Sequence, residues 1–375
     1  MDTLRLLCVP LGLVIIAFAV LSAIRTFVLP RAGLTLVSRI VLRLTLWVGR
    51  LIIKPLRGSA REAAINVAVP LALVLIVVAF LGLIWLGNLL VFIGLGNSFR
   101  QAYTDSGSSL SVLGFANVRT DLDWVTTAIS EALTGTLTIA LLIGFLPTIY
   151  GIYAQREGSI AALEAEVGKS GSAVAILERF GAASERTGLD HLWSEWTRWF
   201  ALLGDTHSSL AGILFVHSSQ PHRSWVTTAG GVLDAAALAN AALDRPRDPQ
   251  ADRCVDAGGE ALRQILDAIR IAPDGDPHSD ATAIHVSRAE FDAACDALAQ
   301  AGLAVKEDRG AAWEAFVRRR RRYDASLITL CRLTLPPTAP WSSDRAAALS
   351  PLLPPVLPAS GSPRQRRPAA DDSGG

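Results

Sequence analysis

Residues 106–117 read SGSSLSVLGFAN, a short run of small and polar residues between two long apolar segments. Each flanking segment is long enough to cross a lipid bilayer, which takes about 20 apolar residues. A polar loop placed between two membrane spans can bring backbone carbonyls into the membrane, where they replace the water around an ion. This placement favours a pore-forming membrane protein over an enzyme.

Three apolar runs in the first part of the chain carry no charged residue: residues 6–24, 67–96 and 132–155. The second and third leave no polar face to turn toward water, as a soluble helix would. The first run has an alternative interpretation as a secretory signal peptide, although its cleavage-like motif Ala17-Phe18-Ala19 lies inside the apolar run. We expect an all-α membrane protein with three transmembrane helices and one re-entrant pore loop.

The segment 31–64, between the first two runs, is strongly basic. As a further span it would place several arginines in hydrocarbon, at a cost of about 2.5 kcal/mol or more each. In a helix that lies at the level of the lipid headgroups, the apolar residues can face the hydrocarbon and the basic residues can face the headgroups. At about 100° per residue, one arc of about 60° holds the basic residues predicted to face the lipid, Arg39, Arg43, Arg50 and Lys54.

This basic segment also predicts the orientation, because cytoplasmic loops carry an excess of Lys and Arg. The N-terminus and the loop around residues 98–120 would then lie outside, and the chain after Arg156 inside. The outer side carries Arg100, Asp105, Arg119, Asp121 and Asp123 and is therefore slightly acidic, which attracts cations. We expect a multi-pass protein of the plasma membrane, with the lipid bilayer as a partner and a cytoplasmic C-terminal domain.

A cation filter built from backbone oxygens needs a short helix with its C-terminal end toward the ion, and residues free to adopt unusual φ angles. Residues 98–109 are the candidate helix, residues 112–115 the candidate carbonyls, and Gly114 the residue that reaches positive φ. The alternative is a plain external hairpin, but the segment is longer and more polar than a simple connection usually is.

Residues 102–117 resemble the pore region of the bacterial two-helix potassium channels. Where such channels carry Thr-Thr-Val-Gly-Tyr-Gly-Asp, this chain carries SVLGFAN, residues 111–117, and the flanking spans keep the order helix, pore loop, helix. The resemblance covers about residues 65–155. It implies a permeant monovalent cation, with potassium the first candidate, and a homotetramer, because one loop cannot enclose an ion. The filter residues that it implies are Ser111, Val112, Leu113, Gly114, Phe115 and Ala116.

Three residues depart from that pattern. Val112 replaces a Thr whose hydroxyl would bind the innermost ion, and Asn117 replaces an Asp at the outer mouth. Ala116 replaces the second Gly, at a cost of about 1–2 kcal/mol if the position is left-handed. A cation pore of weaker selectivity and a non-conducting relative are therefore alternatives to a potassium channel.

The third apolar run would line the cavity behind the filter. Gly135, Gly144 and Pro147 are positions where this helix can bend, and we predict them as a gate hinge. The glycines equally allow close helix packing, which is the alternative interpretation. Glu131, at the outer end of the run, is expected to be solvated.

Residues 157–335 alternate helical patterns with short breaks and predict an α-helical cytoplasmic domain. Ser287 and Glu290 form a capping box that opens a helix, and residues 313–335 are expected to be the last helix. Residues 336–375, rich in Pro, Ser and Ala, are predicted to be a disordered tail. A stripe at helical spacing is typical of a core: Leu192, Trp193, Trp196, Trp199, Phe200 and Leu203.

The composition narrows the function further. A formal net charge of +1 over 375 residues gives no case for nucleic-acid binding. Four widely spaced cysteines predict free thiols, and His217 and His222 are expected to be solvated, so no metal site is predicted. The sequence holds no nucleotide-binding or hydrolase motif, and we expect neither an enzyme nor a cofactor beyond the permeant ion.

The sequence thus divides into a first transmembrane helix (1–30), a basic interfacial helix (31–64), a channel-like part (65–156), the helical domain (157–335) and the tail (336–375). Arg318 to Arg322 form either a solvated helix face or a contact with anionic headgroups. The rival to a cation channel is a non-conducting membrane anchor or sensor whose helical domain binds a partner of unknown identity.

Overall fold

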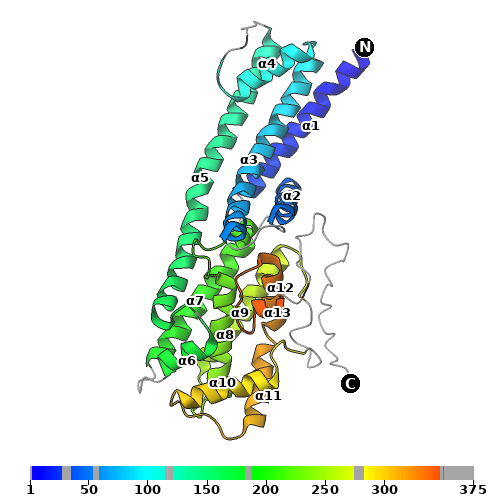
Figure 1. Cartoon of the computed structure of the whole chain (residues 1–375). Helices are drawn as coiled ribbons and strands as arrows, with labels where there is room; N and C mark the ends of the chain where they lie inside the picture. Colours follow the sequence, from blue (N-terminus) through cyan, green and yellow to red (C-terminus); the bar gives the residue numbers. More distant parts are fainter. Residues whose placement is uncertain are drawn as a thin grey trace, which may run out of the picture.

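The computed structural model describes residues 2–27, 35–53, 59–114, 116, 121–169, 171–181, 187–273, 283–346 and 349. Throughout these residues the regular elements are helices, with one isolated β-bridge between Leu243 and Val305, and this confirms the predicted all-α class. Figure 1 shows a bundle of long helices at one end of the molecule and a unit of shorter helices at the other.

The bundle consists mainly of α1 (Asp2–Phe27), α3 (Ser59–Gly94) and α5 (Leu122–Val167). All three are long and apolar enough to cross a membrane, in agreement with the three predicted spans. α1 and α3 approach closely where two glycines face each other, because a Cβ atom on Gly87 would lie 2.9 Å from the Gly12 oxygen. Small residues at such crossings let two backbones pack without intervening side chains.

The helix α2 (Leu36–Ile53) lies across the end of the bundle that is remote from the N-terminus, and Figure 1 shows it nearly end-on. Val37 packs with Ile76 and Phe80 of α3. An adjoining side of α2 exposes an apolar stripe at helical spacing, formed by Ile40, Leu44, Trp47 and Leu51.

The C-terminal unit is built around α8 (Trp225–Ala241), whose alanine-rich surface is buried on nearly every side. The predicted tryptophan stripe lies on α7 (Thr187–Ser209) and is buried, which confirms its place in the core. The predicted capping box of Ser287 and Glu290 is also confirmed. The remaining elements are α6 (Ala173–Gly181), the 3₁₀ helix η1 (Ala211–Phe215), α9 (Pro249–Ala268), α10 (Arg288–Gln300), α11 (Arg309–Arg320), α12 (Asp324–Thr334) and α13 (Ser343–Ala346).

The expected single helix over residues 313–335 is wrong, because the chain breaks between α11 and α12. The break brings Tyr323 next to Arg320, and both side chains reach Asp234 of α8 in the core. Arg320 also donates to Asp324 at 2.7 Å. A turn between the two helices lets one arginine and one tyrosine satisfy the same buried carboxylate.

Both interpretations of the arginine run are wrong for its central residues. Arg320 is fully buried, and Arg319 pairs with Asp252 at 2.8 Å. These arginines pair with buried carboxylates of α8 and α9, because a buried arginine or a buried carboxylate without a partner would destabilise the fold. Arg318 remains exposed, and Arg322 pairs with Asp256 at the surface.

Residues 336–346, the start of the predicted tail, are packed onto the helical unit. Arg320 donates to the backbone oxygen of Trp341, and the indole ring of Trp341 lies against Phe316. Ala346 is buried as well. The folded unit therefore extends past the predicted boundary at residue 335.

Candidate functional site

The helix α4 (Phe99–Leu110) lies between α3 and α5 along the chain, where the sequence predicts a short helix. Ser98 caps its N-terminus by accepting from the Gln101 backbone, and Gln101 Oε1 accepts from the Ser98 backbone at 3.2 Å. This capping box satisfies two of the unpaired N–H groups at the helix start. The prediction of a helix over residues 98–109 is confirmed, with both ends shifted by one residue.

α4 turns back along its two neighbours instead of bridging their tips (Figure 1). Near its start, Ala102 packs with Leu89 and Phe92 of α3. One turn further, the Ser106 hydroxyl lies 3.3 Å from the backbone oxygen of Trp85, and nine residues separate Trp85 from Gly94. That separation corresponds to about 13 Å along the axis of α3.

The other side of α4 packs on α5. Ser106 donates to Glu131 Oε1 at 2.5 Å, and Glu131 is the tenth residue of α5, which begins at Leu122. At the end of α4, Leu110 lies close to Gly135. A Cβ atom added to Gly135 would be 2.7 Å from the Leu110 side chain. The second half of α4 is therefore packed between the last third of α3 and the first third of α5.

A cluster of polar side chains lies where α4 packs on α5. Glu131 is only 1% exposed, so the expectation that it is solvated is wrong. The physical reason is that α4 folds over it and supplies the Ser106 hydroxyl as a donor. Beside it, Asp105 Oδ2 accepts from Trp124 Nε1 at 2.8 Å and from Asn97 Nδ2 at 3.2 Å.

The predicted filter segment begins at the end of α4. Ser111 is the C-cap residue, and its hydroxyl donates to the Gly107 oxygen at 2.6 Å. Gly114 has φ +68°, as predicted. Val112 has φ +57°, which is unexpected for a β-branched residue. Ala116 is half-buried, and its N–H donates to Ser108 Oγ at 3.0 Å. Phe115 lies outside the described residues.

Two large apolar side chains point away from the protein at this turn. Val112 is 62% exposed and Leu113 is 72% exposed. Neither side chain is covered by the described residues of this chain.

The three predicted hinge positions lie in one continuous helix, α5. Gly135 makes the close contact with Leu110, which is the packing role, whereas a Cβ atom at Gly144 would meet no described atom within 4 Å. Pro147 removes one backbone hydrogen bond from the helix. A hinge at Gly144 and Pro147 stays a prediction.

Of the four predicted lipid-facing basic residues, Arg39 and Arg43 have described side chains, and both lie on α2. Arg43 is exposed, and Arg39 is half-buried. Burial and the neighbouring charge of Arg270 lower the pKa of Arg39, which places this side of α2 near the C-terminal unit. The side chain of Arg50 and the whole of Lys54 lie outside the described part.

Within the described residues, no group of three or more His, Cys, Asp or Glu side chains is arranged to hold a metal ion. None of the four cysteines, all of which lie in the described residues, forms a disulfide bond. A scan against models of known protein families finds no match, and searches of curated proteins and of solved structures likewise find no similar protein.

Proposed function

We propose that the chain is a cation-channel-like membrane protein whose pore is formed by the segments 111–117 of several copies around a shared axis. The observation that carries this proposal is the return of α4 between α3 and α5. In this position the C-terminal end of α4 points toward the middle of the apolar spans. A helix C-terminus bears a partial negative charge, which favours a cation in a setting with little water.

The backbone after α4 supports the same proposal. Positive φ angles at Val112 and Gly114 interrupt the extended conformation, in which successive carbonyls point to opposite sides. Backbone oxygens can then turn toward one side, as an ion site requires. The exposed side chains of Val112 and Leu113 also favour several copies, because neighbouring chains would cover them. Four copies are what the resemblance to two-helix potassium channels implies.

The arrangement of the ends agrees with the proposed orientation. In Figure 1 the N-terminus and α4 lie at one end of the bundle, and α2 and the C-terminal unit lie at the other. The positive-inside rule assigns the basic α2 to the cytoplasmic side. The protein would then sit in the plasma membrane with α4 opening to the outside and the C-terminal unit in the cytoplasm.

The test is ion flux into liposomes that contain the purified full chain, with potassium and sodium compared. We expect flux of monovalent cations, and we expect Gly114→Asp to abolish it by placing a carboxylate in the filter. Gly96→Asp is the matched control, because Gly96 also has positive φ and open space around it but lies outside the filter. Absence of flux from a folded oligomer, or full flux through Gly114→Asp, would contradict the proposal.

A membrane anchor whose helical unit binds a partner is the second candidate function. The size of the C-terminal unit and its separate core favour it. Cysteine labelling along residues 106–117 separates the two, since a pore loop is protected from large reagents and an external hairpin is not.

A further inference from the structure

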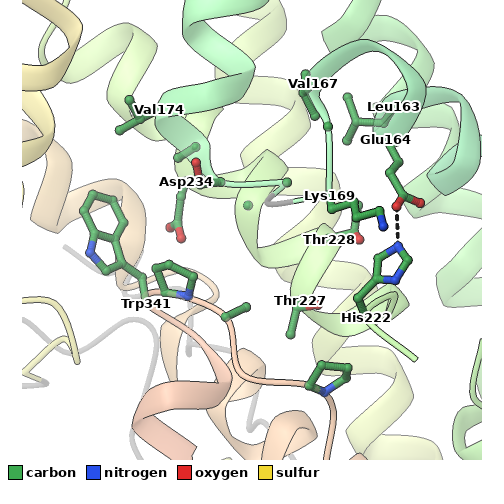
Figure 2. Close-up of a pocket in the computed structure, with 18 of the residues that line it drawn as sticks. Leu163, Glu164, Val167, Lys169, Val174, His222, Thr227, Thr228, Asp234 and Trp341 are labelled. Atoms are coloured by element: carbon green, nitrogen blue, oxygen red, sulfur yellow. Dashed lines mark hydrogen bonds and ion pairs between the residues drawn. The ribbon is translucent and has the colours of Figure 1, made fainter. Parts of the chain in front are cut away.

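The C-terminal unit contains a cavity of about 660 Å³, where α5 ends and α8 begins. Its wall is formed by the end of α5, residues 168, 169 and 171–174, the start of α8, the segment 337–341 and part of α10. Figure 2 shows most of these residues around the open space. Sites for small organic ligands have volumes of about 300–1,000 Å³ and carry a few polar groups on a mainly apolar wall. This cavity has the size and the lining of such a site.

The charged groups around the cavity leave one cation without a counter-ion. Each of the three lining carboxylates has an arginine partner: Glu164 pairs with Arg223, Asp234 with Arg320, and Glu290 with Arg345. Arg320 is shared with Asp324, and Arg345 is shared with Asp344. His222 adds a second partner for Glu164 at 2.5 Å. Lys169 also lines the cavity and makes no ion pair with another described residue. Lys169 is exposed, and it is the lining cation that remains available to an anionic ligand.

Asp234 supplies a polar group that is both buried and directed at the cavity. Its side chain is 3% exposed, yet it belongs to the cavity wall. The hydrogen bonds that Arg320 and Tyr323 donate both end on Oδ1. Figure 2 shows the carboxylate facing the open space, so Oδ2 can accept from a donor on a ligand.

The start of α8 adds to the positive side of the site. Thr227 and Thr228 lie in its first turn and line the cavity. The N-cap residue Ser224 makes no side-chain hydrogen bond to this turn. Unpaired backbone N–H groups and the helix dipole both favour an anion at such a position.

We propose that this cavity binds a small organic anion. Its anionic group would lie near Lys169 and the first turn of α8, and a hydroxyl or amine on the same molecule would donate to Asp234. Its apolar part would pack against Val174 and Trp341. Since α5 supplies Leu163 and Val167 to the wall, an occupied cavity would act on the helix that also lines the proposed pore; only this last consequence rests on the proposed function.

A charge-selective labelling experiment on the full chain tests the electrostatic part. In a Val174→Cys variant, the thiolate attacks a methanethiosulfonate reagent, forms a disulfide and releases methanesulfinate. After normalisation to free 2-mercaptoethanol, we expect the anionic sulfonatoethyl reagent to react about threefold or more faster than the cationic trimethylammonioethyl reagent. The buried native thiols Cys254, Cys295 and Cys331 give little background, and burial raises the pKa of Cys254 to about 12. Cys8 is half-buried and is replaced by serine in every variant of this experiment.

Two charge reversals complete this experiment. Added to Val174→Cys, Lys169→Glu is expected to invert the ratio, whereas Arg318→Glu, an exposed residue outside the cavity wall, is expected to leave it unchanged. A thiol at position 174 that does not react, or that reacts faster with the cationic reagent, overturns the proposal.

Equilibrium binding of 8-anilinonaphthalene-1-sulfonate, an apolar molecule with one anionic group, tests the site directly. With the full chain in nanodiscs, we expect a saturable signal above the lipid background. Lys169→Glu should weaken this binding about tenfold, Val174→Trp should abolish it by filling the cavity, and Arg318→Glu should not change it. No saturable signal, or equal binding by all variants, overturns the proposal. These readouts do not depend on conduction, so their failure is distinct from failure of the ion-flux test.

Discussion

Val112 is an unusual residue for its backbone conformation. A β-branched side chain in the left-handed region is strained, at a cost of about 1–2 kcal/mol, and glycine or asparagine is the usual occupant. The sequence predicts positive φ at Gly114, because glycine allows it, but nothing in a valine indicates it. The end of α4 imposes this conformation, since the Val112 N–H donates to the Ser109 oxygen in the closing turn.

Replacing Val112 by glycine is expected to stabilise the folded chain by about 1 kcal/mol, because the strain at positive φ disappears. The measurement is the urea midpoint of unfolding in detergent, followed by tryptophan fluorescence. Leu113→Gly is the matched control, since Leu113 is the next residue, is similarly exposed and does not have positive φ. Leu113→Gly should not raise the urea midpoint. Equal changes of the midpoint in the two variants would argue against strain at Val112.

Ser106 is the donor that makes a buried Glu131 tolerable. Its removal leaves a buried carboxyl oxygen without a partner, which costs about 1–3 kcal/mol. We expect Ser106→Ala to lower the free energy of unfolding by that amount in the same urea titration. Ser109→Ala removes a hydroxyl from the same helix at a position with no side-chain hydrogen bond to a described residue, and its effect should be smaller. A loss of equal size in both variants would contradict the role of Ser106.

Among the elements, α4 is the one whose placement matters most for the proposed function. A helix over residues 98–109 is predicted as the short helix that a cation filter needs, and the structure adds a capping box of Ser98 and Gln101 at its start. The sequence does not predict the direction in which it runs. That direction depends on contacts with Trp85 and Glu131, which are far from α4 in the sequence and lie on two different helices.

The groove that holds α4 depends on a glycine in α5. Valine in place of Gly135 would collide with Leu110, and overpacking of this kind costs about 1–3 kcal/mol. We expect Gly135→Val to lower the unfolding midpoint and to make cysteines introduced at residues 108–112 react faster. Gly144→Val is the control in the same helix, because no described atom lies within 4 Å of its added Cβ. Equal behaviour of the two variants would favour a general loss of helix flexibility over the packing contact.

In the whole molecule, α5 joins the bundle to the C-terminal unit. Arg156, near the centre of this connection, donates to the backbone oxygen of Val216 at 2.7 Å and lies 3.2 Å from Nε2 of His207. Because an arginine N–H can only donate, Nε2 must be the acceptor, and the proton of a neutral His207 must sit on Nδ1. The junction is therefore built for an uncharged histidine.

This junction predicts how stability depends on pH. Burial and the charge of Arg156 lower the pKa of His207 well below its usual 6.5. The unfolded chain then binds a proton before the folded chain does, so stability should fall as the pH drops below about 6.5, by at most about 1.4 kcal/mol per pH unit for this group. His207→Gln keeps an acceptor for Arg156 and cannot titrate.

The measurement is the thermal midpoint of the full chain between pH 7.5 and pH 5, followed by tryptophan fluorescence. We expect a smaller pH dependence in His207→Gln than in the unmodified protein. His191→Gln, a substitution at an exposed histidine of the same helix, should leave the slope unchanged. If His207→Gln does not change the pH dependence of the thermal midpoint, His207 is not the cause of that dependence.

The sequence by itself determined the helical class, the three long apolar helices, the capped start of α10, and the tryptophan core of α7. These features follow from local rules, because hydrophobic periodicity and capping depend on residues a few positions apart. The tertiary structure alone decided that α4 turns back, that Glu131 and Arg320 are buried, and that the last helices break at Arg321–Tyr323. Each of these outcomes requires a partner that is distant in sequence, such as Ser106 for Glu131 or Asp234 for Arg320, and a buried polar group is stable only where folding brings that partner to it.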